Sequence, residues 1–225
     1  MTVLWDQAVD VLRESILAYA YVFNGNLGAG ILTVTFLARL ALMPVTLRLA
    51  RITAAHQRVM LKIQPELDAI KTRYANDARR MNEEIQKVFS RESISPVPLV
   101  GCLGALAQAP VLSALYSAVS QVVVLGGRFA WIRDISQPNV ILTIIVAGIG
   151  ALGTSIGPQP SAENRTLMML LPTIITMIVL WKMAAGVALY WGMSNVFGVA
   201  QGFVAGRHAD RIRYSASLGL QVNAS

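Results

Sequence analysis

Five long apolar segments constrain the fold of this 225-residue chain more than any other feature. They cover approximately residues 27–49, 99–125, 140–157, 167–181 and 184–205. A helix needs roughly 20 apolar residues to cross a bilayer core of about 30 Å. Hydrophobic residues make up 55% of the chain and charged residues only 14%, which is unusual for a soluble protein. The pattern predicts an all-α polytopic membrane protein with five transmembrane helices.

Basic residues indicate how these helices are oriented. The stretch between the first two segments contains Arg48, Arg51, Arg58, Lys62, Lys71, Arg73, Arg79, Arg80, Lys87 and Arg91. The positive-inside rule places this stretch in the cytoplasm. Five spans then put the N-terminus outside and the C-terminus in the cytoplasm, and a tail with Arg207, Arg211 and Arg213 agrees with that orientation. The predicted outer side contains only Arg13, Arg128, Arg133 and Lys182.

The segments outside the spans have patterns of their own. Near the N-terminus, Trp5, Val9, Leu12, Ile16 and Tyr19 recur at helical spacing, which favours an amphipathic surface helix over a sixth span. The predicted organisation is an outer amphipathic helix (1–24), a first span (25–49), a cytoplasmic helical hairpin (50–96), a second span (97–125), an outer loop (126–139), a third span (140–157), a cytoplasmic loop (158–165), the fourth and fifth spans (166–205) and a cytoplasmic tail (206–225).

The cytoplasmic stretch predicts two helices. Pro65 fits the first turn of one helix, and residues 75–77 supply a break before the second. The apolar positions are Leu67, Ile70 and Tyr74 in the first arm and Met81, Ile85 and Phe89 in the second. The hairpin is either a docking surface whose apolar seam accepts a partner helix or a charged connector between two spans.

Arg39 is a permanent charge near the centre of the first apolar segment. Such a charge costs about 2.5–3.5 kcal/mol on insertion scales and usually faces protein or water. None of the five segments contains Asp or Glu, which argues against a buried ion pair. Snorkelling is limited because Arg48, at the cytoplasmic edge, is roughly 15 Å away along a helix. We therefore expect a hydrated cavity lined by neutral polar groups such as Gln108, Thr154, Ser155, Ser194 and Asn195.

The residue types in this chain do not indicate a site for covalent catalysis, a cofactor or a metal. The chain has one cysteine, Cys102, and two histidines, His56 and His208, which are far apart in sequence. No nucleophilic side chain and general base occur at a spacing that is typical of a catalytic pair. Arginine stays protonated and cannot act as a general base. We predict no catalytic residues, no metal site and no cofactor.

Several motifs resemble those of the YidC insertase family, in matching order and spacing. They are RLALMPVT (39–46), QPELDAIKTRYAND (64–77), PLVGCLGALAQAPVLSALY (98–116), WIRDISQPN (131–139) and LYWGMSNVFGVAQ (189–201). The resemblance extends from about Leu27 to Arg207. It implies five spans around a hydrophilic groove that is open to the cytoplasm and to lipid and closed on the outer side. The chain resembles the short form of the family, which has no large outer β-domain.

The resemblance also implies roles for individual residues. The family's groove arginine corresponds to Arg39, and the aromatic pair of the fifth span to Tyr190 and Trp191. Thr154 falls near a position where a glutamine often supports the arginine. Two other departures are Val97, where an asparagine is common, and Ala109, where a methionine is common.

The function implied is that of a membrane protein insertase in the bacterial cytoplasmic membrane. Its partners would be nascent membrane proteins and the lipid bilayer, with the ribosome, the signal-recognition machinery and the Sec translocase as further candidates. Sequence-specific binding of nucleic acid is not expected. Two alternatives stay open, a small anion channel or transporter with Arg39 as its selectivity charge, and an assembly factor for a membrane complex.

Overall fold

The described part of the chain is helical, which confirms the predicted all-α fold class. The computed structural model describes the backbone of residues 2–92, 99–156 and 165–217, and the side chains of residues 3–56, 58–92, 109–155 and 170–204. Its helices are α1 (Thr2–Val22), α2 (Leu27–Arg73), α3 (Ala78–Arg91), α4 (Leu99–Val123), α5 (Val140–Ile156), α6 (Arg165–Trp181) and α7 (Ala185–Ser217). Most of the predicted cytoplasmic loop and the last residues of the tail lie outside the described residues.

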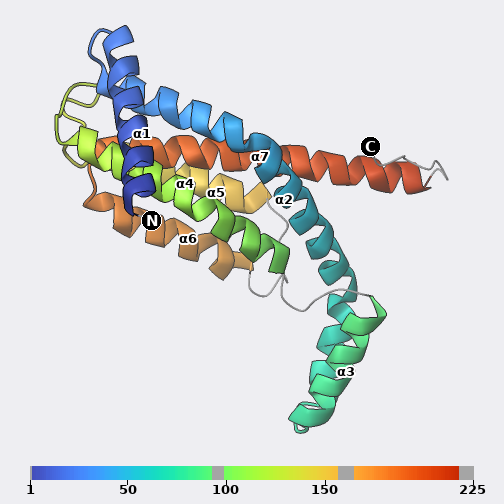
Figure 1. Cartoon of the computed structure of the whole chain (residues 1–225). Coiled ribbons are helices and arrows are strands. Elements are labelled where there is room, and N and C mark those ends of the chain that lie inside the picture. The colour runs from blue at the N-terminus through green and yellow to red at the C-terminus, as the bar shows by residue number, and fades with distance from the viewer. Residues whose placement is uncertain (1, 93–98, 157–164, 218–225) are drawn as a thin grey trace.

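Helix α7 is the central helix of the bundle. It packs against α2, α4 and α5, whereas α6 packs on α5, and α1 crosses α2 and α4. The hairpin formed by the end of α2 and by α3 projects away from the bundle, as Figure 1 shows. Among the described elements, α3 packs only on α2. The hairpin therefore has a position from which it can meet a partner without rearranging the bundle.

Helix α2 differs from the predicted division into a span and a separate hairpin arm. It continues for 47 residues through Pro44 and Pro65, so no break occurs near residue 50 and Pro65 does not begin a helix. Residues 45–64 contain no proline or glycine to end the helix. Pro65 is accommodated because Ile63 and Leu67 on either side of it are buried against α3. Figure 1 shows a pronounced turn in α2 between its blue and teal parts. Pro44 lies inside this helix, and the missing N–H and the ring of a proline disturb a helix.

Helix α7 also extends further than predicted. Its helical conformation runs to Ser217, past the boundary at residue 205 where a tail was expected to begin. No proline follows Pro172 in the sequence, so nothing of that kind stops the helix. At its other end, residues 182–184 make a tight turn from α6 into α7.

The tightest core lies at the end of the bundle that contains the loop between α4 and α5. Ile31 of α2, Leu115 of α4, Val146 of α5 and Leu180 of α6 are all at most 1% exposed. The backbone of this loop is tied to the start of α7, because the N–H of Ala185 donates to Gln137 O and that of Gly186 to Ile135 O, each at 2.9 Å. This end of the bundle is therefore filled by side chains and closed by a loop.

Helix α1 packs directly on the bundle. Val9, Ile16 and Ala20 are buried and Leu12 packs against the same core, so the inward face includes three of the five apolar residues that marked the predicted amphipathic helix, whereas Trp5 and Tyr19 remain exposed. Gly30 of α2 makes the approach possible, since a Cβ there would collide with the backbone oxygen of Ile16. Close contact of two helix backbones requires a residue without a side chain at the crossing.

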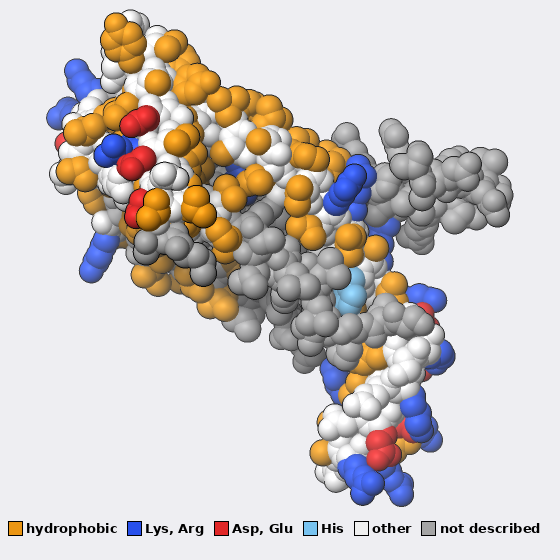
Figure 2. Space-filling model, viewed as in Figure 1, with side chains coloured by type: hydrophobic (Ala, Val, Ile, Leu, Met, Phe, Trp, Pro, Cys, Tyr) orange, Lys and Arg blue, Asp and Glu red, His pale blue; other side chains and the backbone are white. Residues whose placement is uncertain are grey.

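Large apolar side chains cover the outside of the bundle. Leu40, Ile141, Ile144, Leu171, Ile175 and Ile178 are examples, each more than 40% exposed. In Figure 2 hydrophobic side chains spread over the middle of the bundle, while Lys, Arg, Asp and Glu gather at its two ends, on the hairpin and around α1. Soluble proteins rarely expose apolar surface of this extent. Among the described residues, α2 alone is long and apolar enough to cross a membrane by length and composition, and residues 109–123, 140–155 and 170–181 form shorter apolar helices.

Candidate functional site

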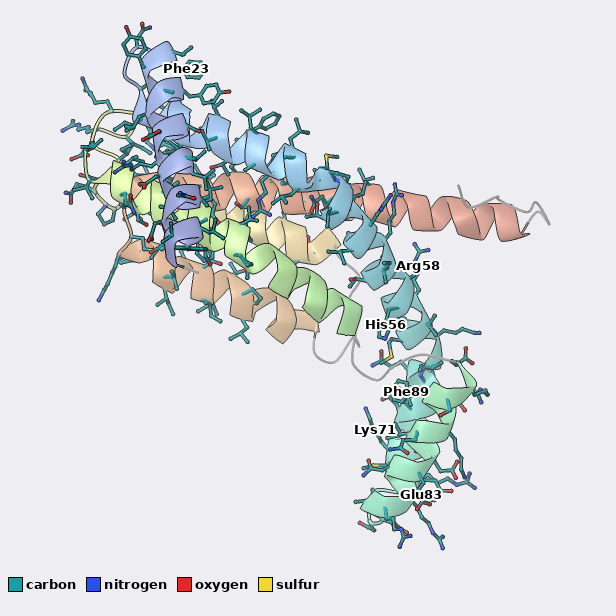
Figure 3. The ribbon with its side chains drawn as sticks, in the orientation of Figure 1. Phe23, His56, Arg58, Lys71, Glu83 and Phe89 are labelled. Atoms are coloured by element: carbon teal, nitrogen blue, oxygen red, sulfur yellow. The ribbon has the colours of Figure 1, made fainter. Side chains whose placement is uncertain are left out.

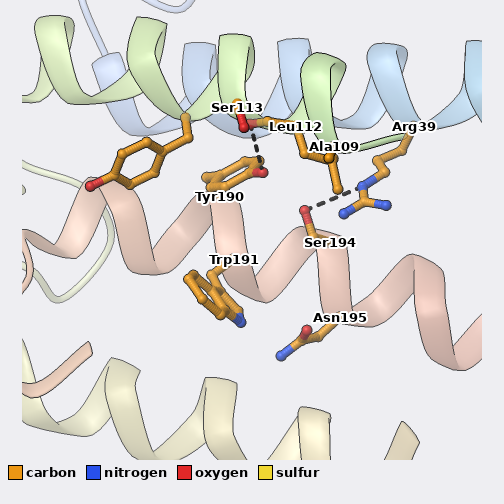
Figure 4. Close-up of a pocket in the computed structure, with 9 residues that line it drawn as sticks. Arg39, Ala109, Leu112, Ser113, Tyr190, Trp191, Ser194 and Asn195 are labelled. Atoms are coloured by element: carbon orange, nitrogen blue, oxygen red, sulfur yellow. Dashed lines mark hydrogen bonds between the residues drawn. The ribbon is translucent and has the colours of Figure 1, made fainter. Parts of the chain in front are cut away.

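A cavity of about 450 Å³ lies between α2, α4 and α7 (Figure 4). It is lined by Arg39, Ala109, Leu112, Ser113, Tyr116, Tyr190, Trp191, Ser194 and Asn195. The lining combines one cation, several neutral hydrogen-bonding groups and apolar side chains. A cavity of this kind can hold a polar group of a ligand while its apolar part stays outside.

Arg39 is the charged group of this cavity. Its side chain is half-buried, and its Nε donates a hydrogen bond of 3.3 Å to Ser194 Oγ of α7. Among the residues that the structure describes, no carboxylate lies within ion-pair distance of the guanidinium. A guanidinium with only a neutral partner keeps most of its capacity to bind an anion or a carbonyl oxygen.

The part of α7 that faces the cavity is fixed on two sides. Tyr190 Oη donates to the carbonyl of Leu112 in α4 at 3.2 Å, and Asn195 Nδ2 donates to the carbonyl of Val146 in α5 at 3.3 Å. Residues four apart lie on the same face of a helix. Figure 4 shows Tyr190 and Ser194 directed toward α4 and α2, and Trp191 and Asn195 toward α5. One turn of α7 thus links three neighbouring helices.

A second polar contact between α2 and α7 lies close to the turn in α2. Thr46 is buried, donates to the carbonyl of Met43 at 3.1 Å and accepts a hydrogen bond from Gln201 Nε2. Both residues follow the cavity residues of their own helix by seven positions, which places them on the same side of α2 and α7. The contact extends the polar seam between these helices toward the hairpin.

Five of the seven predicted groove residues come together in this cavity, namely Arg39, Tyr190, Trp191, Ser194 and Asn195. Thr154 is half-buried on α5, where its Oγ1 donates to the carbonyl of Ala151, and it is not among the lining residues that are described. The side chain of Gln108 lies outside the described residues, as do those of Cys102 and Val97.

The sequence prediction missed the contribution of α4. Ala109, Leu112, Ser113 and Tyr116 line the cavity at spacings of three and four, which is one face of a helix. The sequence contains a pattern that could have indicated this face, because Ser113 and Tyr116 are polar residues on one side of an apolar helix. The prediction names only Gln108 in this helix.

The hairpin has an apolar core of its own. Ile63 and Leu67 of α2 pack against Val88 and Phe89 of α3, and all four are buried. Ile70 and Ile85 pack at the edge of this cluster, while Tyr74 and Met81 are half-buried near the turn. Leu67 and Phe89 are therefore covered by the hairpin itself. A partner that docks here would meet the charged outer surface, where Figure 3 shows Lys71 and Glu83.

Two ion pairs between described residues join the two arms of the hairpin. Lys62 Nζ of α2 lies 4.0 Å from Glu92 Oε2 at the end of α3, and the shorter pair is formed by Arg91 and Glu66. Arg91 of α3 donates to both carboxylate oxygens of Glu66 of α2, at 3.1 and 2.6 Å. The hydrogen bond from Arg91 lowers the pKa of the Glu66 carboxyl, and the same bond raises the pKa of Arg91. Both groups are exposed to solvent, so the pair fixes the register of the arms more than it stabilises them. Within the described residues, no group of His, Cys, Asp and Glu has the composition of a metal site.

Comparison with known proteins assigns the chain to a family. The sequence profile of the family described as "60Kd inner membrane protein" matches residues 19–211. The chain is 36% identical over 210 residues to membrane protein insertase YidC 1 of Lactococcus lactis, covering 89% of this chain and 75% of that protein. This chain belongs to the YidC insertase family.

Other members of the YidC family are similar to different extents. The YidC of Fusobacterium nucleatum is 30% identical over 182 residues, covering 80% of this chain and 85% of that protein. The YidC of Cellvibrio japonicus is 32% identical over 200 residues, and the match spans only 35% of that protein. A crystal structure of an active YidC insertase with its first transmembrane domain resolved shares the fold, with a TM-score of 0.59, 21% identity and coverage of 85% of this chain and 45% of that chain.

Proposed function

We propose that this chain is a membrane protein insertase that works without covalent catalysis. The observation that carries the proposal is Arg39, a half-buried cation whose only described hydrogen-bond partner is the neutral Ser194, in a cavity within an apolar bundle. Such a site attracts a polar or anionic segment and replaces part of its hydration. The related insertases of Lactococcus and Fusobacterium support the same function for this chain.

The proposed arrangement in the membrane has five spans, formed by the first part of α2, by α4, α5 and α6 and by the first part of α7. The concentration of basic residues in the second half of α2 and in α3 supports a cytoplasmic hairpin. The N-terminus then lies outside and the C-terminus in the cytoplasm. In this orientation the tightly packed end of the bundle, around Leu115 and Ile135, faces the outer side. The inner bacterial membrane is the proposed location, in line with the family description.

The proposed mechanism follows from the two surfaces of the bundle. The hydrophilic segment of a nascent membrane protein enters the cavity, where Arg39, Tyr190, Ser194 and Asn195 offer hydrogen bonds in place of water. The apolar helix of the substrate moves along the exposed apolar surface into lipid, and transfer of some 20 apolar residues into hydrocarbon provides the driving force. An acidic outer segment is drawn across by the membrane potential as well.

The hairpin is the proposed site of first contact with the substrate or with the machinery that delivers it. Its projection from the bundle and its charged outer surface support this role. The ribosome, the signal-recognition machinery and the Sec translocase are the proposed partners. Deletion of residues 66–90 distinguishes a docking surface from a connector, because only a docking surface is needed for growth of cells that depend on this protein.

Replacement of Arg39 tests the proposed function directly. In cells depleted of their own insertase, we expect Arg39→Ala to reduce insertion of a single-span substrate with an acidic outer tail by about 10-fold, the equivalent of one lost charge-assisted hydrogen bond. Arg39→Lys should retain an intermediate activity, because the charge remains and the planar fork is lost. Insertion is measured by protease protection of the tail.

The control for this experiment is Arg128→Ala, which removes an exposed cation in the loop between α4 and α5, away from both the cavity lining and the hairpin. Full activity of both Arg39 variants on several acidic substrates would contradict the proposal. Flux of a small anion through purified protein in vesicles, without insertion of any substrate, would instead support a channel.

A further inference from the structure

The orientation of the Arg39 guanidinium is fixed by a residue of another helix. Its Nε donates to Ser194 Oγ at 3.3 Å, and no other residue that the structure describes hydrogen bonds to the guanidinium. An arginine side chain gives up about 2 kcal/mol of rotamer entropy when it is fixed. In a cavity of about 450 Å³ an unrestrained guanidinium has room to adopt several positions. The contact with Ser194 selects one of them.

The selected position has a chemical consequence. A guanidinium binds a carboxylate with two parallel N–H bonds, through either its two terminal nitrogens or one of them together with Nε. Ser194 occupies Nε, so the pair of terminal nitrogens is the edge that remains. Figure 4 shows the Arg39–Ser194 bond among the side chains that line the cavity. Arg39 lines the cavity, so these two terminal nitrogens are the guanidinium groups that remain available to a substrate there.

Ser194 is itself well placed to act as a fixed point. One turn before it, Tyr190 is 7% exposed and bonded to α4, and the next residue, Asn195, is bonded to α5. Gly192 allows this part of α7 to approach α5, since a Cβ there would lie 2.9 Å from Val146 Cγ2. Rotation or sliding of α7 near Ser194 would break these contacts. The hydroxyl group is thus held relative to α2 by packing on two other helices.

We propose that Ser194 is a positioning residue that holds the Arg39 guanidinium with its two terminal nitrogens toward the cavity, so that they bind a substrate carboxylate in bidentate fashion. The inference rests on the proposed insertase function and adds to it the residue that orients Arg39. Ser194 acts through Arg39. Removing the Ser194 hydroxyl leaves the charge of Arg39 in the cavity, but the guanidinium is no longer held in one orientation.

The test uses purified full-length protein in vesicles of bacterial phospholipid. Two single-span substrates differ only in an outer tail that carries either glutamates or glutamines. We expect Ser194→Ala to reduce insertion of the acidic substrate by about 3- to 10-fold, as for one hydrogen bond, and that of the neutral substrate by less than about twofold. Ser194→Thr, which keeps a hydroxyl, should restore the preference. In an Arg39→Lys background, Ser194→Ala should cause no further loss, because lysine has no fork to align.

A second measurement reports on Arg39 without any substrate. In protein labelled with 15N-arginine and placed in nanodiscs, the Nε–H resonance of Arg39 is identified by its loss in Arg39→Lys. We expect Ser194→Ala to shift or broaden this resonance, and Ser194→Thr to leave it sharp. Ser15→Ala is the matched control, because Ser15 Oγ donates to the carbonyl of Val11 within α1. If Ser194→Ala does not accumulate, Ser194→Cys takes its place, since it keeps the size and has a weaker acceptor.

Each outcome decides the inference. An equal loss for both substrates would show a structural role and overturn it, as would unchanged insertion or an unchanged Nε–H resonance. If the wild-type protein inserts neither substrate, the proposed function fails, and the resonance alone then tests whether Ser194 positions Arg39.

Discussion

Arg39 and Leu115 lie in interiors of opposite character. Arg39 is half-buried beside neutral polar groups and a cavity, whereas Leu115 is 1% exposed within a dense apolar cluster. The hydrogen-bond partners of the cavity residues are a serine hydroxyl and backbone carbonyls. Polar contacts of this kind leave the charge of Arg39 uncompensated. The apolar cluster, in contrast, holds the helices in the positions from which these side chains reach one another.

Truncation of Leu115 should destabilise the bundle. Leu→Ala in a protein core costs about 2–5 kcal/mol, and we expect a value near the lower limit because helices unfolded within a membrane keep their apolar side chains in lipid. The loss then comes mainly from the cavity that remains. The measurement is thermal unfolding of the purified protein in detergent.

Ile178→Ala is the control for this prediction. Ile178 is 68% exposed on α6, so the substitution removes a similar side-chain volume without leaving a cavity. Equal stability of the Leu115→Ala and Ile178→Ala proteins would contradict the assignment of Leu115 to the core.

Individual helices differ in how they are held. Helix α7 has neighbours on several sides, while α3 has only α2 among the described elements. The hairpin depends on one small apolar cluster and on the ion pair between Glu66 and Arg91. Local opening is easiest where few buried contacts hold an element. The arms of the hairpin should therefore separate under conditions that leave the bundle intact.

The register between the two arms of the hairpin should be less well defined at acidic pH. Hydrogen bonding from Arg91 lowers the pKa of Glu66 from its usual value of 4.5 when the arms are closed. The contribution of the Glu66–Arg91 pair to the closed arrangement is therefore fully present above pH 4.5. It is lost as the pH falls through the lowered pKa of Glu66. Spin labels on α2 and α3 of the full-length protein should show a broader distance distribution at pH 3 than at pH 7.

Glu66→Gln should remove this pH dependence of the distance distribution and give the broader form at both pH values. Glu83→Gln is the matched control, since Glu83 pairs with Arg79 inside α3 and does not join the arms. A distribution that broadens to the same extent in wild type and Glu66→Gln would assign the effect to another group.

The whole molecule consists of a closed bundle and a projecting hairpin that share α2. The turn near Pro44 sets the direction in which the hairpin leaves the bundle, and the contact between Thr46 and Gln201 follows immediately. Proline removes one helix hydrogen bond and its ring displaces the carbonyl of the preceding turn. The position of the hairpin relative to the cavity is thus determined at a single place in α2.

Pro44→Ala should straighten α2 and move the hairpin away from the loop between α4 and α5. Spin labels at Asn82 and Arg128, both exposed, should become more distant, because a straight α2 is longer end to end than a bent one. Pro65→Ala is the control, since Pro65 lies within the hairpin arm beyond the turn. An unchanged distance in Pro44→Ala would show that packing on α7, and not the proline, bends the helix.

The sequence by itself determined the helical fold, the approximate places of its apolar segments, the absence of an acidic partner for Arg39 within them and the family resemblance, which the comparisons confirmed. The helical fold and its segments follow from composition, helical periodicity and local breaks at residues 75–77 and 182–184, whereas the family resemblance rests on the order and spacing of the matched motifs. Arg39, Ser194 and Asn195 could be named because a charge or a polar group stands out on an apolar helix, whereas Tyr190 and Trp191 were named from the family resemblance.

Only the tertiary structure decided which residues meet. Continuation of α2 through Pro65 depends on burial of Ile63 and Leu67 against α3, which outweighs the local cost of a proline. The face of α4 that joins the cavity and the pairing of Arg39 with Ser194 depend on how α7 packs between its neighbours. Contacts between residues 155 positions apart are set by packing of whole helices, and local sequence patterns do not encode them.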